Sequence, residues 1–250
     1  MTSPFGDLNH LSELQRRGWR YALSFCSLFG ILFYYANTLY TWLAQPLLHQ
    51  LPEGSQLVAT QITAPFLIPM KCALICAFLG TLPQLIWEIW GFIKTGLYPS
   101  ERHRVWPLGL ATLILFYTGV LFAYTIICPT ALRFFIQTRP ESIQFMIDIG
   151  HYVDFIVSIC FYTGLAFETP LITFAVITLG WLSLAQLSYF RKYVIVAAFV
   201  LGMLLTPPDV VSQILLALPI WGLFELGLLA ARWQRRQQRQ RQRFNAKDHI

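Results

Sequence analysis

Residues 106–127 read WPLGLATLILFYTGVLFAYTII, a run of 22 residues without a charged side chain. A helix needs about 20 mostly apolar residues to cross the hydrocarbon core of a bilayer, which is about 30 Å thick. The composition of the whole chain also indicates a lipid environment, because 56% of its residues are hydrophobic and only 12% are charged. Soluble domains carry about 25% charged residues. The run therefore predicts a transmembrane helix in a membrane protein.

Further apolar segments on both sides of this run predict six spans in all. The others are Trp19–Leu39, Cys72–Trp90, Tyr152–Leu179, Tyr193–Leu205 and Val210–Phe224. The fifth span has 13 residues, so at about 1.5 Å per residue it reaches only ~20 Å. We expect the last two helices to form a short hairpin that locally thins the bilayer or leans on longer neighbours. The predicted fold is an all-α polytopic membrane protein.

Basic residues are segregated along the chain. Of its 18 Lys and Arg residues, 15 fall on the side of the N-terminus: Arg16, Arg17, Arg20, Lys94, Arg102, Arg104, Arg191, Lys192, Arg232, Arg235, Arg236, Arg239, Arg241, Arg243 and Lys247. The other three are Lys71, Arg133 and Arg139. Because cytoplasmic loops carry the excess of Lys and Arg, both termini are predicted to be cytoplasmic. The net charge of +6 is thus explained without nucleic acid.

This pattern also sets the expected organisation. One membrane domain should cover residues 1–231, and a basic cytoplasmic tail should cover residues 232–250. The segments Tyr40–Lys71 and Cys128–His151 are long and rich in proline and aromatic residues, so we expect them to form an ordered periplasmic cap.

Glu168 is the acid that most needs an explanation, because it lies near the middle of the fourth span. A charged carboxylate at that depth costs about 2.5–3.5 kcal/mol on insertion scales, so we expect it to be protonated or to face a wet concavity. Pro170 cannot donate to the carbonyl of Ala166 and predicts a kink beside it. A Glu168 hydrogen-bonded between helices is the structural alternative. Glu88, by contrast, lies one turn from the predicted interface and can reach water.

Enzymatic patterns are missing from the sequence. It contains no HExxH, GxSxG, GxGxxG or Walker motif. Its five cysteines have no metal-binding spacing and are interpreted as buried, inert thiols. We therefore expect no catalytic set, no metal and no cofactor.

Several separated motifs resemble the TatC family over nearly the whole chain. His10–Leu14 (HLSEL) is similar to the family's HLxEL opening, Phe167–Pro170 (FETP) to its FExP element, and Thr206–Gln213 (TPPDVVSQ) to its TPPDxxSQ turn. Further matches are Pro83, Trp90, Phe92, Gly96, Leu97, Glu101, Arg102, Arg191, Lys192, Tyr193, Pro219, Phe224 and Glu225. Two positions depart from the pattern: Gln15 replaces the usual Arg, and Thr95 replaces the usual Pro.

The resemblance implies a receptor subunit of the twin-arginine translocase in the bacterial cytoplasmic membrane. Such proteins, with a TatB-like partner, bind twin-arginine signal peptides of folded cargo at the cytoplasmic face. TatA-like subunits then join a hetero-oligomer of several copies, and transport uses the proton-motive force. The implied signal-peptide residues are Glu13, Glu101, His10, Leu14, Phe92 and Arg102. The positions that imply contact with a partner helix are Met203, Thr206 and Gln213.

Two alternatives remain open from the residues alone. Glu13 and Glu101 lie among basic residues, so a solvated salt-bridge face explains each of them equally well. A proton-coupled secondary transporter using Glu168 is the rival function, favoured by an acid beside a proline kink and disfavoured by the lack of a visible internal repeat. An intramembrane enzyme would lack a nucleophile–base set.

Overall fold

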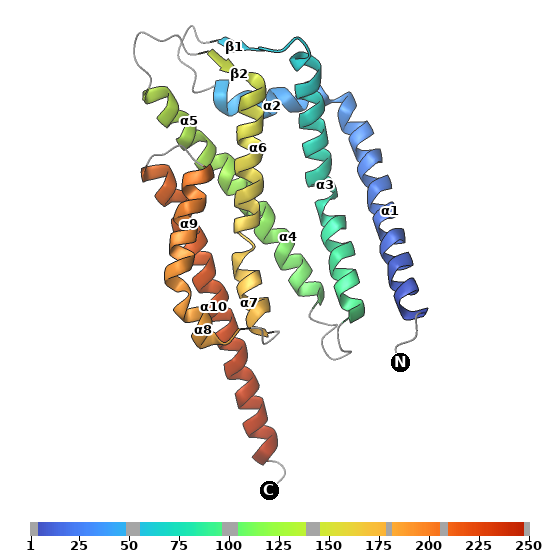
Figure 1. Cartoon of the computed structure of the whole chain (residues 1–250), viewed down its shortest axis with the longest axis vertical. Coiled ribbons are helices and arrows are strands. Elements are labelled where there is room, and N and C mark those ends of the chain that lie inside the picture. The colour runs from blue at the N-terminus through green and yellow to red at the C-terminus, as the bar shows by residue number, and fades with distance from the viewer. Residues whose placement is uncertain are drawn as a thin grey trace. The chain divides into compact units, whose positions relative to one another are not determined.

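The structure is a computed structural model of the 250-residue chain, and it describes residues 5–48, 56–96, 105–138, 146–178, 182–205 and 210–247. Helices account for nearly all of them (Figure 1). In chain order the elements are α1 (Phe5–Tyr34), α2 (Ala36–Leu48), β1 (Gln56–Val58), α3 (Ala64–Gly96), α4 (Val105–Phe122), the π-helix η2 (Ala123–Ile127), α5 (Cys128–Gln137), β2 (Met146–Asp148), α6 (Ile149–Ala166), α7 (Thr169–Thr178), α8 (Leu184–Tyr189), α9 (Arg191–Leu205) and α10 (Val210–Lys247).

Four segments of the described chain are long and apolar enough to cross a membrane. They are Ala64–Phe92, Trp106–Gln137, Ile149–Ile177 and Val210–Trp233. A fifth is reached if Gln15–Tyr34 and Ala36–Gln45, which meet at a bend of 78°, count as one broken span. The chain is thus a helical protein with four or five candidate membrane spans, and the count of six stays a prediction.

Four predicted boundaries were wrong. The second span begins at Ala64 and not at Cys72, because the helix continues through Pro69. The first span does not continue to Leu39, because the chain bends after Tyr34 and a new helix begins at Ala36. The third does not stop at Ile127, because the π-helix leads directly into α5, where Pro129 occupies a tolerated first-turn position. The sixth helix is not short: its apolar part has 24 residues and ends at Trp233. Only α9, with 15 residues, is as short as expected.

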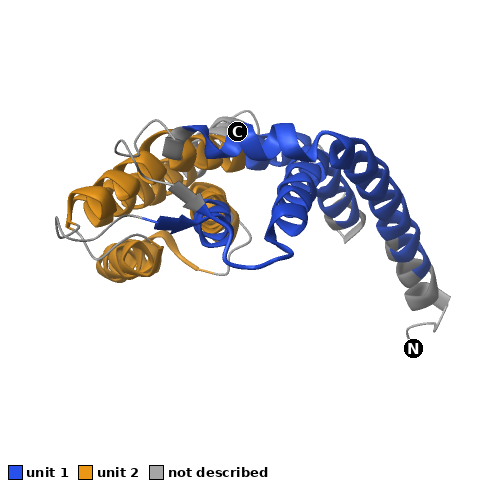
Figure 2. Cartoon of the chain, turned by 90° about the horizontal axis from the view of Figure 1, so that it is seen from above, with its two compact units in different colours: residues 1–114, 140–157 blue, residues 115–139, 158–250 orange. Residues whose placement is uncertain are grey.

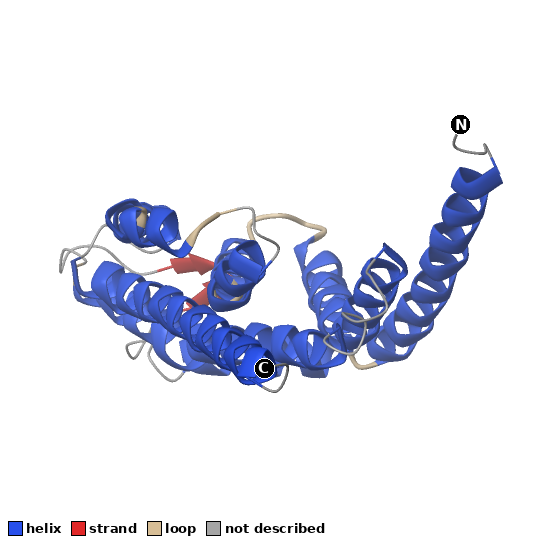
Figure 3. Cartoon of the chain, turned by 90° about the horizontal axis from the view of Figure 1, so that it is seen from below, coloured by secondary structure: helices blue, strands red, loops and turns tan. Residues whose placement is uncertain are grey.

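A small sheet departs from the all-α prediction. Strands β1 and β2 have three residues each and pair in parallel, with Gln56 opposite Met146 and Val58 opposite Asp148 (red in Figure 3). The two strands are far apart in the sequence, so no local pattern indicates their pairing. They belong to the two segments that were expected to form a cap.

The chain divides into two compact units, which are described separately (Figure 2). Unit 1 contains residues 1–114 and 140–157. Its main contact is between α1 and α3. Aromatic side chains four residues apart, Tyr21, Phe25, Phe29 and Phe33, follow one another along α1 with ring centroids 5.9–6.4 Å apart. The last of these rings packs edge-on against Phe66 of α3, so it joins the two helices.

Unit 2 contains residues 115–139 and 158–250, and α10 packs there against α7, α8 and α9. A glycine makes the α7 contact possible, because a Cβ on Gly227 would lie 2.7 Å from the carbonyl oxygen of Pro170. Small residues let helix backbones approach closely in membranes. The core of this unit is formed by Ile177, Leu187, Phe224, Leu228 and Ala231.

The helix is interrupted beside Pro170, where the kink was predicted. Helix α6 ends at Ala166, and α7 begins at Thr169. The Thr169 hydroxyl donates to the carbonyl oxygen of Ala166 at 2.5 Å, so a side chain serves a carbonyl that the helix leaves unpaired. Glu168 lies in the break itself.

Candidate functional site

An ion-pair network joins the N-terminal part of α1 to the C-terminal part of α3 in unit 1. Glu13, Arg17 and Arg20 occupy positions i, i+4 and i+7 of α1, which lie on one face of a helix. The Arg17 guanidinium reaches Glu13 Oε1 with NH2 at 2.7 Å and with Nε at 3.2 Å. Its NH1 reaches Oε2 of Glu88 on α3 at 3.1 Å. Arg20 NH2 lies 3.4 Å from the same Glu88 oxygen.

Burial is uneven across the network. The Arg17 and Glu88 side chains are 18% and 14% exposed, whereas Glu13 is 40% and Arg20 is 56% exposed. Gly91 allows this arrangement, because a Cβ there would lie 2.4 Å from Arg17 NH1. Arg17 therefore lies directly against the backbone of α3 and holds a shielded pair with Glu88, while the carboxylate of Glu13 is the accessible acid of the network.

The predicted signal-peptide residues are only partly covered by the structure. Glu13 belongs to the network, and Phe92 lies one turn after Glu88 with 37% exposure. His10 and Leu14 lie on α1, but their side chains are outside the described part of the chain. The remaining two, Glu101 and Arg102, lie outside the described residues. The structure thus places one of the two expected acids and leaves its distance to the other untested.

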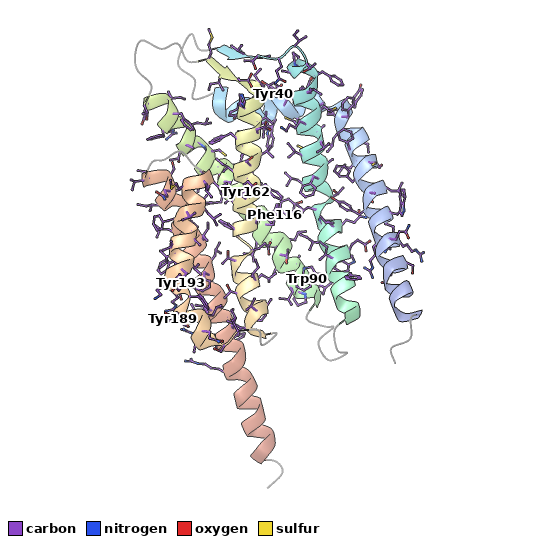
Figure 4. All side chains as sticks on the ribbon, in the orientation of Figure 1. Tyr40, Trp90, Phe116, Tyr162, Tyr189 and Tyr193 are labelled. Atoms are coloured by element: carbon purple, nitrogen blue, oxygen red, sulfur yellow. The ribbon has the colours of Figure 1, made fainter. Side chains whose placement is uncertain are left out.

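Glu88 and Arg17 are the residues that sequence reasoning missed. Glu88 was interpreted as an acid reaching water, but it is shielded and faces two arginines. Its signal was present in the sequence, since Arg17 and Arg20 are three positions apart and share a helix face. What the sequence lacks is the register between α1 and α3. The indole of Trp90 marks the same end of α3 (Figure 4) and packs on Gly109 of α4, whose added Cβ would lie 3.2 Å from the ring.

Glu168 is a buried acid of unit 2. Its side chain is 9% exposed, and its Oε1 has no hydrogen-bond partner among the residues that the structure describes. The hydroxyl of Thr163, five residues earlier and fully buried, likewise has none within that part of the chain. The structural alternative was a Glu168 side chain hydrogen-bonded between helices. For Oε1, the structure shows no such hydrogen bond within the described residues.

The three expected partner-helix positions behave differently. Gln213 of α10 donates from Nε2 to the carbonyl oxygen of Phe199 on α9 at 2.9 Å, so its amide joins the two helices. Gly202 permits the close approach, because its Cβ would lie 3.1 Å from Gln213 Cγ. Met203 is 65% exposed, whereas Thr206 lies outside the described residues.

A second group of basic residues lies where α8, α9 and α10 pack together in unit 2. Arg191 donates from NH2 to Glu225 Oε2 at 2.9 Å, which explains why an acid can lie inside the long α10 helix. Lys192 lies 4.6 Å and 5.2 Å from the ring centres of Tyr189 and Tyr193 (Figure 4). Arg191 and Lys192 are thus both occupied by neighbours in unit 2.

The opposite end of unit 1 is held by Asp148, at the junction of β2 and α6. Its carboxylate accepts hydrogen bonds from the hydroxyl and amide of Thr60 at 2.5 Å and 3.1 Å, and from the amide of His151 at 3.0 Å. These donors lower the pKa of Asp148 from 3.8 to about 2, and the Thr60 hydroxyl has the largest effect. An ion pair between Lys71 and Asp154 joins α3 to α6 nearby.

Comparison with known proteins gives one consistent result. The chain matches the family model described as "Sec-independent protein translocase protein (TatC)" over residues 9–219. It is 43% identical over 219 residues to TatC of Azotobacter chroococcum mcd 1, covering 88% of this chain and 86% of that protein. It is also 43% identical over 229 residues to TatC of Haemophilus influenzae, covering 90% and 88%. The crystal structure of the twin arginine translocase receptor TatC in DDM is similar, with a TM-score of 0.75, 33% identity, and coverage of 89% of this chain and 99% of that chain.

Proposed function

Because this chain belongs to the TatC family of Sec-independent protein translocase proteins, we propose that it is the membrane receptor subunit of a twin-arginine translocase. In this role it binds the paired arginines of signal peptides on folded cargo at the cytoplasmic face. The observation that carries the proposal is the accessible carboxylate of Glu13, held on α1 by a network anchored at Glu88. Arginine presents a planar fork of donors that matches a carboxylate bidentately.

The remaining signal-peptide positions extend this proposal by family resemblance. Glu101 and Arg102 follow α3 in the sequence, and Phe92 lies near its end. His10 and Leu14 flank Glu13 on α1. Glu13 and Glu101 would then present one acid from each of two segments, which suits a ligand with two adjacent guanidinium groups.

The proposed topology has six spans, both termini in the cytoplasm, and the protein in the bacterial inner membrane. The segregation of Lys and Arg supports it, with α9 as the short fifth span. In this arrangement the segments Tyr40–Lys71 and Cys128–His151, which contain β1 and β2, form the periplasmic cap. Residues 1–231 make a single membrane domain, and residues 232–250 a basic cytoplasmic tail.

The proposed partners are TatB-like and TatA-like single-helix subunits, assembled in several copies around signal peptide and bilayer. With 15 residues, α9 covers only about 22 Å at about 1.5 Å per residue. Its Met203 and Leu204 are 65% and 75% exposed. An apolar helix from another subunit at Met203, Thr206 and Gln213 would cover this surface.

The direct test is retention of a twin-arginine precursor by the purified, detergent-solubilised complex. A hydrogen bond to a charged group contributes about 1.5–3 kcal/mol, and exposure moves the loss toward the lower end. Glu13→Ala and Glu101→Ala should therefore each weaken precursor binding roughly tenfold, and the double variant should abolish export. Glu141→Ala, an acid assigned to the opposite face, is the matched control. Unchanged retention by a well-expressed double variant would contradict the proposal.

The secondary-transporter alternative receives no support from the comparisons. Glu168 is still unusual, because its buried Oε1 has no hydrogen-bond partner among the described residues. A proton flux that depends on substrate, measured in liposomes holding this protein alone, is the observation that would restore that alternative.

A further inference from the structure

We propose that Arg17 is a resident competitor of the cargo arginine, so that it sets both the affinity and the arginine selectivity of the Glu13 site. The inference rests on the proposed function, because it concerns the same carboxylate. It adds that the site is already filled by a guanidinium of the receptor itself, which must leave Glu13 before the signal peptide can bind fully.

The contacts of Arg17 show why the two guanidinium groups compete. Arg17 presents Nε and NH2 to one oxygen of Glu13, at 3.2 Å and 2.7 Å. A carboxylate oxygen has about two lone-pair sites, so these two donors fill Oε1. A cargo arginine that binds Glu13 bidentately needs both carboxylate oxygens. It can form that arrangement only after Arg17 has released Oε1.

Arg17 can make this exchange without leaving a partly buried charge unpaired. Its NH1 stays 3.1 Å from Glu88 Oε2 and 3.5 Å from the Glu88 carbonyl oxygen. This pair is the shielded part of the network, whereas Glu13 is its exposed end. An uncompensated buried charge is costly, so the Arg17 guanidinium should stay beside Glu88 of α3 when Glu13 turns to a ligand. Glu88 thereby remains the ion-pair partner of Arg17 after Glu13 has been released.

Charge balance explains how the same residue gives selectivity. Glu13 and Glu88 are matched by Arg17 and Arg20, so the four side chains carry no net charge. A cation arriving at Glu13 gains little from long-range attraction and must replace two hydrogen bonds. An arginine fork can do so, but a lysine ammonium acts as a point charge. Arg17 thus raises the cost of entry for every cation and leaves arginine at an advantage.

The opposite role is that Arg17 merely positions Glu13 for binding. The two roles predict opposite signs for the effect of removing the guanidinium. A competitor, once removed, leaves a tighter and less selective site, whereas the loss of a positioning residue leaves a weaker one. The sign of the change in Kd therefore decides between them.

The experiment measures Kd by fluorescence anisotropy for labelled twin-arginine and twin-lysine signal peptides. The receptor is the purified complex with its partner subunits in nanodiscs. Arg17→Gln removes the charge and keeps a side chain that can hydrogen-bond. Arg16→Gln is the matched control, because Arg16 is an exposed neighbour without an ion pair in the described part of the chain. Both variants change the charge of α1 by the same amount, so general electrostatics affects them alike.

We expect Arg17→Gln to tighten twin-arginine binding about two- to fivefold, the range that exposed ion pairs produce. Twin-lysine binding should tighten by a larger factor, so the ratio of the two Kd values should shrink. Arg17→Lys should fall between the native protein and Arg17→Gln, and Arg16→Gln should change neither Kd by as much as Arg17→Gln.

Three results would overturn the inference. Weaker binding by Arg17→Gln, with normal binding by Arg16→Gln, would assign Arg17 a positioning role. Equal tightening by both variants would reduce the effect to overall charge. If the native protein bound neither peptide, or if Glu13→Ala bound both normally, the proposed function would fail and this inference with it. If the native protein binds and Glu13→Ala does not, but Arg17→Gln fails to tighten binding, this inference alone fails.

Discussion

At the scale of single residues, Asp148 offers a contact whose pH dependence can be derived. Its folded-state pKa of about 2 lies below its ordinary value of 3.8, because Thr60 and His151 donate hydrogen bonds to the ionised form. A depressed carboxyl pKa stabilises the fold above the unfolded pKa, and this contribution is lost as the pH falls through the folded one. Asp148 should therefore contribute fully at neutral pH and lose its effect between about pH 4 and pH 2.

We accordingly predict that Asp148→Asn lowers the Tm of the purified protein at pH 7. The difference from the native protein should narrow below pH 4 and vanish only below about pH 2, as measured by intrinsic fluorescence during heating. Thr60→Val, which removes one of the donors, should give a smaller change of the same sign. A constant difference between native and Asp148→Asn protein across this pH range would show that the ionised carboxylate is not what holds the segment after β1 to the start of α6.

The same scale shows where sequence reasoning stops. Glu13 could be predicted because a motif and an acid among basic residues coincide at one position. Its pairing with Arg17 also follows from a spacing of four residues on a helix. The contact between Arg17 and Glu88 could not be predicted, because it depends on how α1 and α3 are aligned, and Gly91 supplies the space for it. Long-range register is a property of packing and has no local signal.

At the scale of helices, hydropathy located the apolar segments well and their ends poorly. The sequence YYAN at the end of α1 contains neither proline nor glycine, yet the chain bends there by 78°. Conversely, Pro129 and Pro219 stand inside helical stretches that continue. The sequence predicts that the last apolar span stops before Glu225, but this acid pairs with Arg191 and α10 continues past it. Contacts with other helices thus determine where a helix ends, and composition alone can predict a different end.

The short helix α9 leads to a prediction about its partner. Because it is too short to span the full core and exposes Met203, we expect the helix of a TatB-like or TatA-like subunit to pack along it. A cysteine at Met203 should form a disulfide with a cysteine in that helix when membranes are oxidised, as detected on non-reducing gels. The background should carry Cys26→Ser, since Cys26 is an exposed thiol.

The matched control is a cysteine at Leu23 of α1, which is 66% exposed, close to the 65% of Met203. If accessibility alone governed crosslinking, both positions would react to the same extent. Crosslinks at Leu23 together with none at Met203 would exclude α9 as the docking helix.

At the scale of the whole molecule, the open question is how many times the chain crosses the bilayer. Hydropathy and length support four or five spans in the described chain, whereas the charge pattern supports six with both termini inside. The disagreement concerns two places: the bent pair at the N-terminus and α9, whose 15 residues fall short of the about 20 that a span requires. A topology map can test each place separately.

Reporter fusions after Glu53, Glu141 and Asp209 should behave as periplasmic, and those after Ser100, Gln186 and Arg236 as cytoplasmic. The pair Gln186 and Asp209 is the sharpest comparison, because α9 is the one predicted span that lies between them. If α9 crosses, a phosphatase reporter should be active after Asp209 and inactive after Gln186. Equal activity at the two sites would show that α9 does not cross; with α10 crossing, the C-terminal tail would then lie outside. Fifteen basic residues would no longer share one side, and the six-span topology would be wrong.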